Sequence, residues 1–69
     1  MNKKSKTKWV VWFNNKTNKQ DDEWRCVRAH TRDEATNKGK EKLDPYRFTL
    51  GPTYSIKEAR ARFGKGWPF

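Results

Sequence analysis

The sequence predicts a small α+β domain in which a three-stranded antiparallel sheet is packed on one face by helices, in the order β-β-α-β-α. Three observations lead to this prediction. The 69 residues are enough for one domain only. Three segments rich in aromatic and β-branched residues are typical of strands. Two further segments begin with Ser or Thr followed three residues later by Glu, which is the capping-box signature of a helix start.

The first half of the chain predicts a β-hairpin. Residues 8–13 (KWVVWF) are almost wholly aromatic or β-branched, and residues 23–29 (EWRCVRA) carry a similar mixture. Between them, residues 14–22 are polar and rich in Asn, which tolerates the backbone angles of turns. We expect the two strands to pair antiparallel across this loop.

The first helix is predicted to begin at Thr31, with Glu34 completing its capping box. It runs to about Leu43, because the residue before Pro45 avoids helical backbone angles. Small or apolar residues recur every four positions and form a stripe that can lie close against the sheet: Ala35, Gly39 and Leu43.

Residues 46–50 alternate between apolar and polar side chains, which predicts a half-buried third strand ended by Gly51-Pro52. Ser55 and Glu58 then begin a second helix, and Gly64 is suited to end it. Its apolar face consists of Ile56, Ala59 and Phe63. The chain thus divides into a disordered basic arm (1–7), a single domain (8–63) and an aromatic C-terminal tail (64–69).

The charge balance indicates the class of partner. Seventeen Lys and Arg face eight Asp and Glu, giving a net charge of +9 and an isoelectric point of about 10.1. Such an excess favours polyanions, among them DNA, RNA and acidic protein surfaces. The basic residues concentrate at the two ends, since residues 1–19 hold six Lys and no acid.

Other classes of function find little support. The single cysteine forms no internal disulfide and suits a reducing compartment, so we expect a cytoplasmic protein. The single histidine has no second ligand at metal-binding spacing, and no glycine-rich phosphate loop is present. No apolar run is long enough for a membrane span. We therefore expect no enzyme, no catalytic residue, no metal, no cofactor and no membrane partner.

The alternation of the strands predicts a nucleic-acid-binding surface. Placing the heavier apolar residues of each strand inside, including Trp24, Cys26 and Tyr46, leaves an aromatic residue among bases on the open sheet face: Lys8, Trp12, Arg25 and Arg47. Bases stack on such aromatics while phosphates contact the cations. Alternatively, Trp12 only covers the sheet and stacks with a neighbouring Arg for stability.

Two further groups of cations extend this surface. The second helix presents bases away from its apolar face, namely Lys57, Arg60 and Arg62, and the N-terminal arm adds Lys3, Lys4 and Lys6. A solvated helix face and a solubilising arm are the simpler interpretations of the two groups. We expect phosphate-dominated binding of DNA or RNA.

A protein-interaction module is the alternative. A small basic protein, such as a phage-encoded inhibitor or adaptor, can dock on an acidic or nucleic-acid-handling partner without contacting nucleic acid itself. The tail supplies two candidate anchors, Trp67 and Phe69, for a pocket in such a partner. The alternative is that the same two rings fold back and close the small core, since the domain is short of apolar area.

Overall fold

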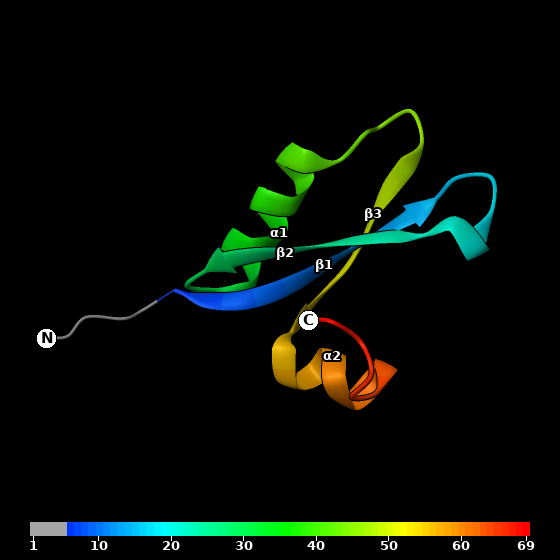
Figure 1. Ribbon diagram of the computed structural model, residues 1–69. Coiled ribbons are helices and arrows are strands. Elements are labelled where there is room, and N and C mark those ends of the chain that lie inside the picture. Colours follow the sequence, from blue (N-terminus) through cyan, green and yellow to red (C-terminus); the bar gives the residue numbers. More distant parts are fainter. Residues whose placement is uncertain (1–5) are drawn as a thin grey trace, which may run out of the picture.

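The computed structural model describes residues 6–69 and shows a central strand between two antiparallel neighbours (Figure 1). The elements follow in the order β1 (Thr7–Asn15), the 3-10 helix η1 (Lys19–Asp21), β2 (Glu23–Ala29), α1 (Arg32–Lys42), β3 (Phe48–Ser55) and α2 (Ile56–Phe63). The sheet order is β2-β1-β3. The predicted α+β class, the three antiparallel strands and the order β-β-α-β-α are confirmed.

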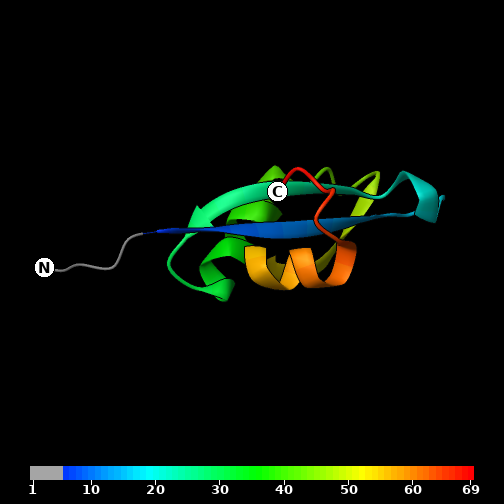
Figure 2. The same cartoon turned by 60° about the horizontal axis from the view of Figure 1, so that its bottom comes forward.

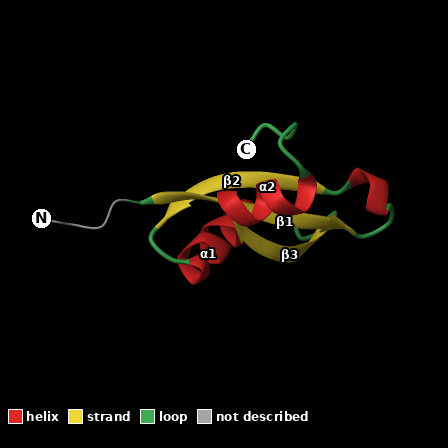
Figure 3. Ribbon diagram, turned by 90° about the horizontal axis from the view of Figure 1, so that it is seen from below, coloured by secondary structure: helices red, strands yellow, loops and turns green. Residues whose placement is uncertain are grey.

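The two helices lie on opposite faces of the sheet, so the expectation that they share one face is wrong. Gly39 of α1 lies against Val11, whereas Phe63 of α2 stacks on the neighbouring Trp12 at 4.8 Å between ring centroids. Neighbouring residues of a strand point to opposite faces. Figure 1 accordingly shows α1 and α2 on either side of the strands, and Figure 3 shows α2 in front of the sheet when it is seen from below.

The α1 face holds the main hydrophobic core. Its buried residues are Val11, Phe13, Val27, Ala29, Ala35 and Phe48, with Trp9, Leu43 and Leu50 packed against them. The predicted stripe on α1 is confirmed, because Ala35 and Gly39 are buried and Leu43 contacts this core.

The α2 face holds a second apolar layer, which we call the aromatic cluster. It consists of Trp12, Trp24, Tyr54, Phe63, Trp67 and Phe69. The C-terminal tail (64–69) turns back after α2 toward β2, as Figure 2 shows, and brings Phe69 to 5.0 Å from Trp24. The tail therefore packs against the chain's own sheet, although Trp67 remains 39% exposed.

Strand β3 differs from its prediction at both ends. It begins at Phe48 and continues through Gly51-Pro52 to Ser55. A bulge makes this possible, because Val11 pairs with Thr53 and Phe13 with Leu50, so that two residues of β3 lie opposite Trp12 alone. A Cβ on Gly51 would lie 2.7 Å from the Trp12 carbonyl oxygen, so this close approach requires glycine.

Tyr46 lies in the turn before β3, and the prediction that it faces the helices is wrong. Residues 45–47 form this turn, and the Tyr46 side chain is 90% exposed. The alternation of buried and exposed side chains begins only at Phe48, which is the first residue of β3 and belongs to the core. It does not extend back to Tyr46.

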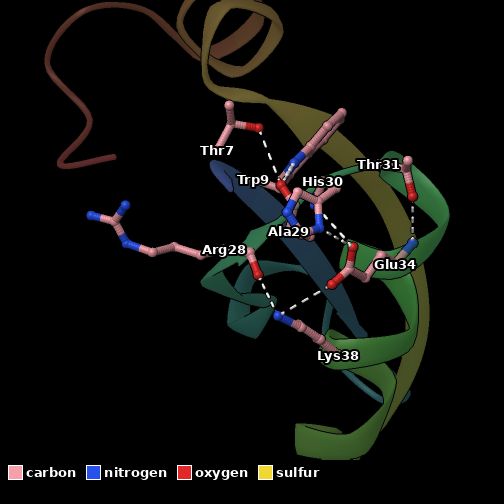
Figure 4. A network of polar contacts seen from close by, with 8 residues as sticks. All are labelled: Thr7, Trp9, Arg28, Ala29, His30, Thr31, Glu34 and Lys38. Carbon is pink, nitrogen blue, oxygen red and sulfur yellow. Dashed lines mark hydrogen bonds and ion pairs between the residues drawn. The ribbon is translucent and has the colours of Figure 1, made fainter. Parts of the chain in front are cut away.

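The helix ends agree with the prediction, with one difference in α1. Thr31 and Ser55 accept hydrogen bonds from the Glu34 and Glu58 N–H groups, both at 3.1 Å. Glu58 completes its capping box by accepting from the Ser55 N–H at 2.9 Å. Glu34 instead accepts from the N–H of His30, one residue before the cap (Figure 4).

Candidate functional site

Two cations of the sheet lie side by side on the α2 face. Lys8 of β1 and Arg28 of β2 are directly paired, and both are exposed. Figure 4 shows the Arg28 side chain extending away from the polar network around Glu34. Like charges directly opposite each other in a sheet repel, so an anion bound between these two side chains relieves an existing repulsion.

Two cations of α2 lie on the side of the helix that is turned away from β3. Arg62 lies over Tyr54 of β3, with its guanidinium 5.7 Å from the ring centroid, so it marks the β3 side of the helix. Arg60 lies about 200° around the helix from Arg62, and Lys57 about 60° from Arg60. Among the described elements, α2 contacts β1 and β3 but not β2. Arg60, with Lys57 next to it, therefore lies on the flank of α2 that is turned away from β3, on the β2 side.

Helix α2 begins at the end of the sheet where Lys8 and Arg28 lie. Ser55, which caps α2, pairs with Trp9, the residue after Lys8. The last residue of the helix, Phe63, stacks on Trp12, further along β1. The first turns of α2 thus lie near Lys8 and Arg28. We call the set Lys8, Arg28, Lys57 and Arg60 the basic surface.

The acidic residues do not neutralise the basic surface. Glu58 pairs with Arg32 at 2.9 Å, and Glu34 contacts Lys38 at 3.5 Å. Asp22 accepts from Trp12 Nε1 at 3.2 Å, at the far end of the hairpin. Within residues 6–69, no ion pair joins an acid to any member of the basic surface.

The structure separates the four residues that the sequence placed together on an open sheet face. Lys8 and Trp12 lie on the α2 face, but Arg25 pairs with Val11 and therefore points to the α1 face. There it contacts Glu23 at 3.5 Å. Arg47 lies in the turn before β3, with its guanidinium 5.4 Å from the Phe48 ring centroid.

The part of the expected open face around Trp12 is not open, because the aromatic cluster covers it. Phe63 stacks on one side of Trp12 and Trp67 lies 6.1 Å away, while Asp22 accepts from its indole N–H. Trp12 is thus only partly exposed, and its geometry fits the alternative interpretation of a ring that covers the sheet.

Of the remaining predicted cations, Lys57 and Arg60 join the basic surface, and Arg62 lies on the other side of α2. Lys6 is exposed just before β1, whereas Lys3 and Lys4 lie outside the described residues. The sequence analysis missed Arg28. Assigning the opposite alternation to the second strand, with Val27 inside, would have found it.

The chemistry of the rest of the surface is limited. Cys26 is partly buried beside a hollow of about 590 Å³ between β2 and α1, which Lys38, Glu41 and Lys42 also line. In the part of the chain that the structure describes, His, Cys, Asp and Glu form no group that could hold a metal ion. Neither helix of residues 6–69 is long and apolar enough to cross a bilayer.

Comparison of the chain with protein-family models, with curated proteins and with solved structures found no match.

Proposed function

We propose that this chain binds nucleic acid through the basic surface, mainly by contacts to phosphates. One observation carries the proposal. Lys8 and Arg28 are paired on the α2 face, Arg60 and Lys57 lie on the flank of α2 turned away from β3, and the neighbouring carboxylates bind other groups. Arg and Lys without internal partners are the residues that replace the counterions of a nucleic acid.

The contacts available here favour backbone binding over base reading. Helix α2 lies flat on the sheet through Ala59 and Phe63, so only its flank and outer side are free. A helix held in this way presents cations to a phosphate backbone but does not enter a groove to contact the edges of bases. We therefore expect weak dependence on base sequence and strong dependence on salt.

The test is a salt titration of a double variant, Lys8→Ala/Arg28→Ala. The binding of labelled duplex DNA, single-stranded DNA and RNA is measured by fluorescence anisotropy between about 50 and 200 mM salt. Loss of two phosphate contacts lowers the slope of log K against log salt by about 1.4 to 1.8. The variant is expected to fold as the parent does, because both side chains are exposed.

The matched control is Lys40→Ala/Lys42→Ala, which removes the same charge from α1 on the opposite face. This control is expected to keep the slope of the parent protein. Equal losses in both double variants would mean that net charge alone drives binding, and the assignment of the surface would be wrong. Binding of polyglutamate as tight as that of nucleic acid would favour the acidic protein partner instead.

A further inference from the structure

Tyr46 is the most exposed aromatic residue of the described chain, and it lies far from the basic surface. Its side chain is 90% exposed, in the turn that joins α1 to β3. Within residues 6–69, its ring takes part in no contact with another aromatic ring, whereas the aromatic cluster contains every other large exposed ring. Both faces of the Tyr46 ring are therefore available to a ligand.

The turn that carries Tyr46 is held by a network of hydrogen bonds. The Tyr46 N–H donates to Asp44 Oδ1 at 3.0 Å, and the N–H groups of Arg47 and Phe48 donate to the Asp44 carbonyl at 3.2 and 3.0 Å. The Lys16 N–H donates to the Arg47 carbonyl at 2.9 Å, and its ammonium group donates to the Pro45 carbonyl. The exposure of Tyr46 is thus a property of an ordered turn.

A small hollow lined by two cations lies beside the ring. A hollow of about 280 Å³ lies beside Tyr46, and its lining is polar: Asn15, Lys16, Thr17, Asp21, Tyr46 and Arg47. Arg47 and Lys16 bring positive charge to it. The one acid, Asp21, accepts a hydrogen bond from the Asn18 amide at 3.0 Å.

We infer that Tyr46 stacks on an unpaired nucleobase, while Arg47 and Lys16 contact the adjacent phosphates. This inference rests on the proposed nucleic-acid binding and specifies its substrate as a single strand. A base offers its face to a protein ring only where it is unstacked, and stacking of this kind tolerates any base. The hydrogen bonds of the turn account for its backbone but give no role to the free ring that it carries.

The position of Tyr46 sets the length of single-stranded nucleic acid that can contact both the Tyr46 turn and the basic surface. Lys8 and Asn15 lie near opposite ends of β1 and are about 23 Å apart at 3.3 Å per residue. At 3.4 Å per nucleotide, this distance corresponds to roughly seven stacked nucleotides. An oligonucleotide of about twelve nucleotides is therefore long enough to contact the turn and the basic surface together.

The experiment compares two proteins with two ligands. Parent protein and Tyr46→Ala are each titrated with a single-stranded oligonucleotide and with the same strand made abasic throughout, so that phosphates remain and bases do not. The parent is expected to bind the normal strand roughly 5- to 150-fold more tightly than Tyr46→Ala does. On the abasic strand the two proteins are expected to bind alike, which isolates the coupling between ring and base.

Two more variants separate stacking from other effects. Tyr46→Phe keeps the ring and is expected to bind as the parent does, whereas Tyr46→Leu keeps apolar area without the ring and is expected to bind as Tyr46→Ala does. Thermal unfolding of all variants is expected to match the parent, because the Tyr46 side chain contacts solvent. Parallel titrations with DNA and RNA strands distinguish the two sources of an unpaired base.

The outcomes distinguish this inference from the proposed function. If the parent binds normal and abasic strands equally, or if Tyr46→Ala binds the normal strand as the parent does, the stacking role of Tyr46 is wrong while phosphate binding stands. If the parent binds none of the nucleic acids even at low salt, the proposed function itself is wrong. A preference of the parent for duplex over single strand likewise contradicts the inference.

Discussion

Among single residues, Gly39 permits the closest approach between α1 and the sheet. A Cβ built on Gly39 would lie 2.5 Å from Cγ1 and 2.8 Å from Cβ of Val11. Both Gly39 and Val11 are buried, so neither side can move into solvent. The glycine lowers the intrinsic stability of the helix by about 1 kcal/mol relative to alanine. The space beside Val11 is nevertheless too small for the Cβ of an alanine.

Gly39→Ala is expected to destabilise the domain despite the better helix propensity of alanine. Overpacking a core costs about 1–3 kcal/mol, which exceeds the gain of up to about 1 kcal/mol in the helix. The control is Gly66→Ala, because a Cβ there meets nothing within 4 Å. Urea unfolding measures both variants, and a Gly39→Ala protein at least as stable as Gly66→Ala would contradict this account.

The alternation of β2 shows why the sequence assigned its side chains to the wrong faces of the sheet. The rule that the heavier apolar side chains face inward assumes one covered face. Here Val10 and Val11 are both fully buried, one on each face of β1. Trp24 belongs to the aromatic cluster and Val27 to the main core. With both faces covered, side-chain size does not identify the α1 face, and the sequence analysis placed Arg25 on the face where the structure has Arg28.

At the scale of the elements, a carboxylate in the first turn of each helix accepts a backbone N–H at the helix start and stabilises it. The His30 backbone N–H lowers the pKa of Glu34 below its ordinary value of 4.5, and the Lys38 ammonium adds to this effect (Figure 4). The Ser55 backbone N–H and the Arg32 side chain similarly lower the pKa of Glu58 below 4.5. Arg32 belongs to α1, so this contact also joins the two helices.

The domain is therefore expected to lose stability in acid. A carboxyl group whose pKa is lower in the folded state stabilises the fold above its ordinary pKa of 4.5, and this contribution is lost as the pH falls through the folded pKa. Thermal unfolding midpoints between neutral pH and about pH 3 measure the effect. Glu58→Gln is expected to lower the midpoint at neutral pH and to flatten its decline in acid.

The control for this series is Glu41→Gln, since Glu41 is exposed on α1 and has no ion-pair partner in residues 6–69. Its midpoints are expected to follow those of the parent at every pH. An acid decline in Glu58→Gln as steep as in the parent would show that the capping carboxylate does not contribute.

The helix starts could be predicted from the sequence, whereas the end of strand β3 could not. Helix starts depend on local hydrogen bonds, so the Ser55 and Glu58 pair could be recognised from four consecutive residues. Strand β3 depends on its partner, because Gly51 and Pro52 continue the strand through a bulge opposite Trp12, at an edge of the sheet. No local pattern reports a bulge of this kind, and the strand was therefore predicted to end too early.

At the scale of the whole molecule, the sheet is enclosed by α1 on one face and by α2 with the C-terminal tail on the other (Figure 2). The tail supplies two of the six rings in the aromatic cluster. The rings of Trp67 and Phe69 stack with 5.8 Å between their centroids, and both make edge contacts with the Trp24 ring. A role of these two rings as anchors for another protein stays a prediction, and it requires the tail to leave this position.

Trp67→Ala/Phe69→Ala is expected to lower the free energy of unfolding by about 1–3 kcal/mol, because several aromatic pairs are lost together. Tryptophan fluorescence is expected to shift to longer wavelength as Trp12 and Trp24 meet water. Lys65→Ala, in the same tail, is the control and should change neither quantity. A double variant as stable as the parent would show that the tail does not close the aromatic cluster, which would favour the docking role.

The borders of the sheet have a consequence for the behaviour of the protein at high concentration. Sheets with free edges can extend by pairing with a second copy, and natural proteins suppress this with Pro, bulges and charged side chains. Pro52 lies in the bulge of β3 and has no N–H to offer to a further strand. On β2, Arg25 and Lys38 donate to the Trp24 and Arg28 carbonyls at 3.0 and 2.6 Å. Both borders thus disfavour strand addition, and concentrated solutions of the protein are expected to contain separate folded units instead of extended sheets.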